Sequence, residues 1–123
     1  MLARKRIYRL GLAGAAALLL SSCSPKQELD NQFGDQHFKT AIALVELHKL
    51  RYGSYPASLA ELKHTGQWDA IALGSVSYRR LPNGYALDLV RGWAGKPNLS
   101  YPADFWHGLG LRESNVGRTP PAR

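Results

Sequence analysis

The single cysteine is the residue of this chain with the most distinctive chemistry. Cys23 stands in the stretch LLSSCS, directly after an apolar run. A lone thiol cannot close a disulfide within its own chain. Its thiolate is nevertheless a good nucleophile for covalent modification. The residues around Cys23 therefore have to indicate what this thiol is for.

The residues before Cys23 are typical of an export signal. Residues 10–20 carry no charge, and they follow a basic start made of Arg4, Lys5, Arg6 and Arg9. Eleven helical residues cover about 16 Å, well short of a bilayer core of about 30 Å. A basic start, a short apolar run and small residues at its end predict a signal peptide over residues 1–22.

The last residues of this signal resemble a bacterial lipobox. In Leu20-Ser21-Ser22-Cys23, an aliphatic residue and two small ones precede the cysteine. The resemblance implies that Cys23 carries a diacylglyceryl thioether and that a peptidase cuts between Ser22 and Cys23. It also implies that the new amine receives an acyl chain such as palmitate. Two or three acyl chains anchor a protein stably, whereas one binds only marginally. An unmodified cysteine behind an ordinary signal is the alternative interpretation.

The residue after Cys23 bears on the destination of the protein. An aspartate at this position resembles the inner-membrane retention signal of enteric bacteria, and this chain has Ser24. We therefore expect an outer-membrane lipoprotein that faces the periplasm, with the inner membrane as the alternative. The covalent lipid on Cys23 is the only cofactor that we expect.

The net charge argues against a nucleic-acid partner. The chain carries +7, but four of its basic residues lie in 1–22 with no acidic residue there. The remaining +3 is spread over about a hundred residues, which is too little and too scattered for a nucleic-acid surface.

The polar residues give no sign of catalysis or of a metal site. His37 and His48 are eleven residues apart, about 16 Å on a helix, which is too far for a shared metal. His48 is instead expected to be a partly buried packing residue. Asp104 and His107 could pair, but no nucleophile motif accompanies them. We expect a protein that is not an enzyme and binds no metal.

The composition divides the mature chain into three parts. Residues 23–35 are polar with Pro and Gly, which predicts a lipidated tether. Residues 36–113 contain the apolar patterns expected of one folded domain. Residues 114–123 contain two prolines and few apolar residues, which predicts a disordered tail.

The clearest element is an amphipathic helix over residues 36–52. Asp35 is its expected N-cap and Gly53 its expected left-handed stop, with Leu44 and His48 at the edge of its apolar face. The apolar face itself recurs at helical spacing: Phe38, Ala41, Ile42, Val45 and Tyr52.

The end of this helix resembles the junction of type II secretion pseudopilins and related type IV pilin-like proteins. In that family, a long helix leads through a glycine to Tyr-Pro and a short leucine-bearing helix. His48 stands where the family usually has tyrosine, and Ser58 with Glu61 predicts a capping box for the short helix. The matching positions are Gly53, Tyr55, Pro56, Leu59 and Leu62.

The following residues predict a small sheet. Alternating residues on both sides of Pro82-Asn83-Gly84 predict a β-hairpin over residues 75–91, which we expect to pack on the apolar face of the helix. A third strand is expected around residues 99–106 or 109–112. The fold class is therefore α+β, with a helix on a small antiparallel sheet, as in a pilin-like head.

Two departures from the pseudopilins limit what the resemblance implies. Filament subunits keep their apolar segment, whereas the cut at Cys23 would remove it here. We therefore expect no filament subunit of the usual kind. The calcium site of the major pseudopilins is not expected either, because Asp88, Asp104 and Glu113 are dispersed.

Aromatic and basic residues supply the candidate binding surface. Trp68, Tyr101, Phe105 and Trp106 are expected in the core, because buried tryptophans stabilise small domains. Trp93 lies between glycines and is the best candidate for exposure. Arg79, on the outer hairpin face, and Trp93 are the candidate partner-binding residues. We expect an unidentified envelope protein as the partner, in a system related to secretion or pili. A module that binds peptidoglycan or lipid through Trp and Arg is the alternative.

Overall fold

A computed structural model describes residues 25–120, so Ser22, Cys23 and the predicted signal peptide lie outside the described residues. Its helices are α2 (Pro25–Tyr52), η1 (Leu59–Glu61), α3 (Gly66–Gly74) and α4 (Ala103–Trp106). Its strands are β1 (Val76–Leu81), β2 (Gly84–Leu89), β3 (Ser100–Tyr101), β4 (Leu111–Glu113) and β5 (Gly117–Arg118).

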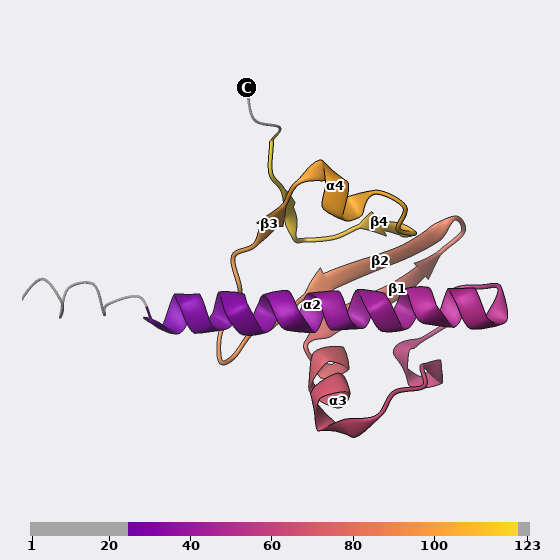
Figure 1. Ribbon diagram of the computed structural model, residues 1–123, viewed down its shortest axis with the longest axis horizontal. Coiled ribbons are helices and arrows are strands. Elements are labelled where there is room, and N and C mark those ends of the chain that lie inside the picture. Colours follow the sequence, from indigo (N-terminus) through magenta and orange to yellow (C-terminus); the bar gives the residue numbers. More distant parts are fainter. Residues whose placement is uncertain (1–24, 121–123) are drawn as a thin grey trace, which may run out of the picture.

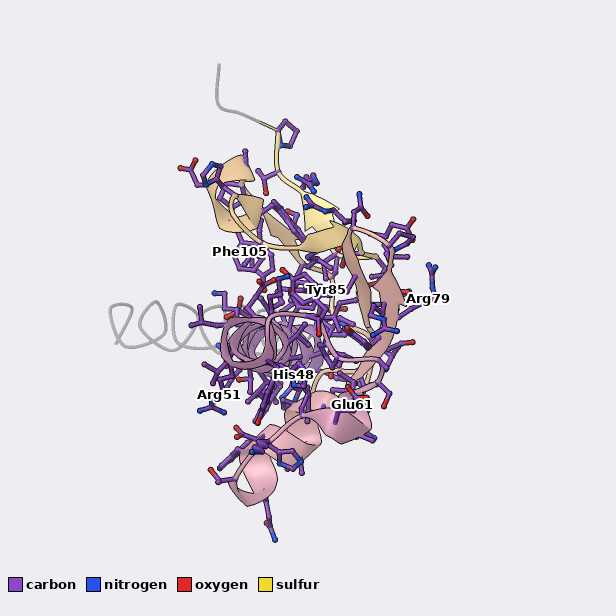
Figure 2. The ribbon with its side chains drawn as sticks, turned by 90° about the vertical axis from the view of Figure 1, so that its right-hand side faces the viewer. His48, Arg51, Glu61, Arg79, Tyr85 and Phe105 are labelled. Atoms are coloured by element: carbon purple, nitrogen blue, oxygen red, sulfur yellow. The ribbon has the colours of Figure 1, made fainter. Side chains whose placement is uncertain are left out.

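The long helix α2 is the axis of the domain. Figure 1 shows it running the length of the molecule, with the β1–β2 hairpin on one side and α3 on the other. Figure 2 looks along α2 and shows the strands beside it, α3 below it and α4 above it. This arrangement confirms the predicted α+β class.

The main sheet has three strands in the order β1-β2-β4. β1 and β2 pair antiparallel, with Tyr78 opposite Leu87. The hairpin and its turn at Pro82-Asn83 were therefore predicted correctly. β4 runs parallel to β2, with Tyr85 beside Leu111, because the chain passes through β3 and α4 before it returns. The sheet is mixed rather than purely antiparallel.

The predicted apolar face of the helix forms the core. Phe38, Ala41 and Val45 are fully buried and Ile42 nearly so, and they pack against Tyr85, Leu87 and other sheet residues. Tyr52 is the exception because its side chain is exposed. Its ring lies 4.7 Å from that of His48 between centroids, at the solvent side of the helix end.

The predicted tether is wrong for residues 25–35, because these residues belong to α2. Asp35 is therefore not an N-cap. It lies inside the helix, where its carboxylate accepts hydrogen bonds from the Tyr101 hydroxyl at 2.6 Å and the Lys39 ammonium at 3.2 Å. Pro25 suits the first helical position, where a missing N–H costs nothing, and Glu28 lies in the first turn.

Packing explains why the helix continues through a sequence that looks like a tether. Gly34 lies against Pro97 and Leu89, and a Cβ added to it would clash with the Pro97 ring. Gly34 therefore permits a close approach rather than a chain break. Asp30 and Asn31 accept hydrogen bonds from the loop that follows β2. In this first part of α2, hydrogen bonds from the loop to Asp30 and Asn31 hold the helix, where an apolar face would normally do so. A prediction based on apolar spacing therefore misses this part of the helix.

The helix ends at the predicted residue. Gly53 has φ +83° and its N–H donates to the Lys49 carbonyl at 2.8 Å, as expected for a left-handed helix stop. The predicted capping box of Ser58 and Glu61 does not form. Glu61 accepts a hydrogen bond from the Ala57 N–H at 2.9 Å, but the Ser58 side chain makes no capping bond. The short helix is one 3-10 turn.

The predicted disordered tail is wrong as far as residue 120. Val116 is buried, and β5 pairs parallel with β3. The Asn115 side chain accepts a hydrogen bond from the Leu89 N–H and donates one to the Leu89 carbonyl, at 2.8 and 2.9 Å. A few specific backbone pairings thus order a segment of low apolar content.

Candidate functional site

The residues of the pseudopilin-like junction lie together between α2 and the sheet. Pro56 is buried, and its carbonyl accepts a hydrogen bond from the Tyr78 hydroxyl at 2.6 Å. Leu62 is in the core and Leu59 packs against it. Together with Gly53 and Tyr55, these residues connect the end of the helix to the hairpin. Their contacts are those of a structural joint rather than of a ligand site.

Glu46 is the polar centre of this joint, and no sequence pattern pointed to it. Its carboxylate accepts hydrogen bonds from the Tyr55 hydroxyl, the Tyr85 hydroxyl and the Gly110 N–H, at 2.9, 2.8 and 3.0 Å. Burial, and then the nearby Glu46 carboxylate, raises the pKa of Tyr55 to about 12, and the same two causes raise the pKa of Tyr85. Glu46 thus joins α2, β2 and the loop before β4. All its partners are donors that need a buried acceptor.

Asp30 holds the loop that carries Trp93. The Asp30 carboxylate is buried and accepts the backbone N–H groups of Trp93, Ala94 and Gly95, at 3.0, 2.8 and 2.8 Å. The bonds from Ala94 and Gly95 are the largest cause of a pKa that lies below the ordinary 3.8, against a smaller opposing effect of burial. The predicted candidate Trp93 is therefore part of a fixed loop.

Trp93 borders an aromatic hollow on the side of α2 that faces α3. This hollow has a volume of about 330 Å³ and is lined by Phe33, His37, Trp68, Ile71, Arg91, Gly92 and Trp93. Trp93 is 56% exposed, which confirms its predicted exposure. Trp68 was expected in the core but is 61% exposed, because it stacks on Phe33 at the rim instead of entering the interior. Trp106 and Tyr101 are buried, as predicted.

His37 forms the floor of the aromatic hollow. Its side chain is almost fully buried, and its ring centroid lies 6.0 Å from that of Phe33. Burial, and secondarily the positive charge of Arg91, lowers the pKa of His37 below 6.5. His37 is therefore neutral at pH 7 and behaves as a packing residue.

Arg79 lies on a different surface from Trp93. It projects from the outer face of β1, away from α2, as Figure 2 shows. Its side chain is 66% exposed, and its guanidinium donates to the Glu113 carboxylate of β4 at 2.8 Å. Arg79 and Trp93, which were predicted to form one surface, belong to two separate faces.

The hairpin end carries a basic groove. This groove has a volume of about 530 Å³ and lies between the end of α2, the β1–β2 turn and β4. Its cationic residues are Lys49, Arg80 and Arg112, and none of the described residues that line it is a carboxylate. Arg112 is held in place by a hydrogen bond from its Nε to the Asn83 carbonyl at 3.2 Å. Such a groove suits carboxylate groups on a partner.

The other polar candidates form no site in the described part of the chain. His48 is partly buried, as predicted, and its Nδ1 has no hydrogen-bond partner there. No hydrogen bond or ion pair joins Asp104 and His107, both of which are exposed. Within residues 25–120, no three His, Cys, Asp or Glu side chains are grouped so as to hold a metal ion. Nor is any helix of these residues long and apolar enough to cross a membrane.

Comparisons of the chain with protein-family models, with curated proteins and with solved structures gave no match.

Proposed function

We propose that this chain is a non-catalytic lipoprotein of the bacterial cell envelope, anchored through Cys23, that works by contact with a partner protein. As the pseudopilin-like junction suggests, its partner belongs to type II secretion or a related pilin-like system. The lipobox-like stretch and the apolar run before it support the anchor. The absence of an aspartate after Cys23 favours the outer membrane.

The observation that carries the proposal is the continuity of α2. It starts at Pro25, two residues after Cys23, and ends at Tyr52 beside the basic groove. Lys49 lies 24 residues beyond Pro25, which corresponds to about 36 Å along the helix axis. A rigid helix of this length would hold the basic groove away from a lipid anchor, where a partner can reach it.

Charge indicates what kind of partner the groove would take. Arg80 makes no ion pair with any described residue, and the described lining of the groove lacks a carboxylate. An acidic segment of the partner would supply the missing negative charge, and arginines are frequent contributors to protein–protein binding energy. Arg79 neighbours Arg80 on β1 but points to the opposite face, away from α2, so it is not part of this contact.

The test is partner capture from envelope extract with the lipidated protein and its charge-reversal variant R80E/R112E. We expect the wild-type protein to retain components of an envelope secretion or pilus system, and the variant to lose them. R51E is the matched control, because Arg51 is exposed on the side of α2 away from the sheet (Figure 2). If R80E/R112E and R51E capture the same proteins as the wild type, the groove is not the contact surface.

A second candidate function is binding to peptidoglycan. The exposed Trp68 and Trp93 beside Arg91 favour it, because aromatic faces stack on sugar rings and a guanidinium pairs with carboxylates. Sedimentation with purified peptidoglycan tests this candidate. Sedimentation of the wild-type protein that is lost in W68S/W93S would show that this surface binds peptidoglycan.

A further inference from the structure

The exposed apolar side chains of the domain are not scattered. Among the described residues, six large apolar side chains are exposed, and three of them border the aromatic hollow. These are Trp68, Ile71 and Trp93, with exposed fractions of 61, 43 and 56%. Contiguous exposed apolar side chains on a small domain mark a surface that contacts something.

Contacts within the domain hold both sides of this surface. The Phe33 and Trp68 rings stack with their centroids 6.3 Å apart. On the other side of the hollow, three backbone N–H bonds to Asp30 fix the loop of Trp93. A preformed aromatic surface loses little conformational entropy when it binds.

The position of this surface relative to Cys23 indicates its occupant. Cys23 precedes Pro25 by two residues, which span at most about 7 Å. Asp30 and Phe33 follow Pro25 by five and eight residues, about 8 and 12 Å along the helix. Residues 25–35, which were predicted to be a flexible tether, are helical, so they do not act as a flexible linker between the domain and a lipid on Cys23. The aromatic hollow would then lie within reach of the bilayer surface.

The chemistry of the surface fits the boundary between headgroups and acyl chains. Tryptophan prefers this boundary because its ring is largely apolar and its N–H needs a polar partner. Arg91 lines the same hollow, and Lys26 lies beside Gly95 at the edge of the Trp93 loop. Both cations could pair with lipid phosphates.

We propose that Phe33, Trp68, Ile71 and Trp93 form a membrane-docking patch, which inserts into the headgroup region of the phospholipid bilayer that holds the lipid on Cys23. This inference rests on the proposed lipid anchor. It gives the domain one orientation, with α2 inclined to the bilayer and the α3 side toward the lipid. The hairpin end then points away from the membrane, since Figure 1 shows α3 and the β1–β2 turn on opposite sides of α2.

The test uses the full lipidated protein in vesicles of phosphatidylethanolamine and phosphatidylglycerol with brominated acyl chains, which quench tryptophan fluorescence at short range. The chain has three tryptophans, and W68F/W93F retains only the buried Trp106 as a background. We expect the brominated lipid to quench most of the Trp68 emission in W93F and most of the Trp93 emission in W68F. In vesicles, both rings should also be protected from quenching by acrylamide in the water.

The matched control is L50W in the W68F/W93F background. Leu50 is 82% exposed and lies 25 residues beyond Pro25 on the same helix, at its far end. We expect the emission of the tryptophan introduced by L50W to be insensitive to the brominated lipid. Equal quenching of this introduced ring and of Trp68 would mean that the domain tumbles without orientation, which would overturn the proposal.

Two further outcomes separate this inference from the proposed function. Protein that floats with the vesicles while Trp68 and Trp93 stay unquenched would disprove the docking patch and leave the anchor intact. Protein that carries no lipid and does not float would disprove the anchor, and the patch with it. Shielding of both rings by peptidoglycan but not by lipid would assign the surface to the cell wall instead.

Discussion

At the scale of single residues, three carboxylates of α2 hold the domain together. Asp30 binds the Trp93 loop, Asp35 binds Tyr101, and Glu46 binds two tyrosines and Gly110. All three accept hydrogen bonds from segments more than 30 residues away in the sequence. Buried or half-buried donors of this kind are costly to leave unpaired. Replacing any of these three acids is therefore expected to lower the free energy of unfolding more than replacing an exposed acid does.

Replacing Glu46 with alanine should destabilise the domain. The change leaves the Tyr55 and Tyr85 hydroxyls and the Gly110 N–H without their acceptor, at a cost of about 3 kcal/mol in the free energy of unfolding. Urea denaturation followed by tryptophan fluorescence measures this cost. E28A, at an exposed position of the first turn, is the control and should lose only the favourable interaction of Glu28 with the helix N-terminus, about 0.5 kcal/mol. An E46A midpoint equal to that of E28A would contradict the role of Glu46.

Asp30 should make the stability of the Trp93 loop dependent on pH. Its folded-state pKa lies below the ordinary 3.8, so the unfolded chain takes up the proton first. The stabilisation is therefore fully present above the ordinary pKa of 3.8 and is lost as the pH falls toward the folded-state pKa. In D30N we expect this acid-dependent part to disappear and amide exchange at Trp93, Ala94 and Gly95 to be faster at pH 6. Unchanged exchange in D30N would show that the loop is held by other contacts.

At the scale of elements, the apolar face of α2 after residue 36 was predictable from the sequence, and the helical state of its polar residues 25–35 was not. Phe38, Ala41, Ile42 and Val45 recur at helical spacing, and this periodicity follows directly from burial on one side. Residues 25–35 lack such a period. They are helical because Gly34 fits against Pro97 and because Asp30 accepts three distant N–H groups. These contacts depend on a loop more than 60 residues later, and no local pattern encodes them.

Aspartate at Ile42 or Val45 should destabilise the fold strongly. Each change would place an unpaired charge among fully or nearly fully buried side chains, at a cost of about 4 kcal/mol or more. Thermal melting by circular dichroism measures the effect. L50D is the control, because Leu50 points into solvent and its replacement should leave the melting temperature nearly unchanged. Wild-type melting of I42D or V45D would mean that this face of the helix is not the core.

Alanine at Gly34 distinguishes a packing glycine from a chain break. Helix propensity alone predicts that G34A stabilises α2 by up to about 1 kcal/mol. We expect the opposite, a loss of about 1–3 kcal/mol, because the new Cβ would clash with the Pro97 ring. G74A is the control, since a Cβ there meets no atom within 4 Å. Chemical denaturation of both variants measures the two effects, and a more stable G34A would argue against the close contact of α2 with the Pro97 loop.

At the scale of the whole molecule, the candidate site was only partly predictable. The exposure of Trp93 follows from its place between Gly92 and Gly95, which favour a loop. Arg79 was correctly placed on the outer face of the hairpin, away from α2. Trp93 lies on a separate face, because its loop is bonded to Asp30 of α2 and borders the aromatic hollow. The basic groove was missed because its cations, Lys49, Arg80 and Arg112, come from three distant segments. Their proximity arises only when β4 pairs parallel with β2.

The aromatic hollow and the basic groove lie at different positions along α2. The aromatic hollow lies near the start of α2, and the basic groove lies at its end. With a lipid on Cys23, the first face would be close to the membrane and the second would be presented to a partner. Both roles depend on that lipid, because an unanchored domain would have no defined orientation at a bilayer.

The most direct test of this account is the intact mass of the protein extracted from bacterial membranes with detergent. We predict a chain that begins at Cys23 and carries a diacylglyceryl group on its thiol and a further acyl chain on its amine. C23A, in which the thiol is absent, is the control and should yield no lipidated product. A soluble wild-type protein that begins at another residue, or one with an unmodified Cys23, would contradict the account.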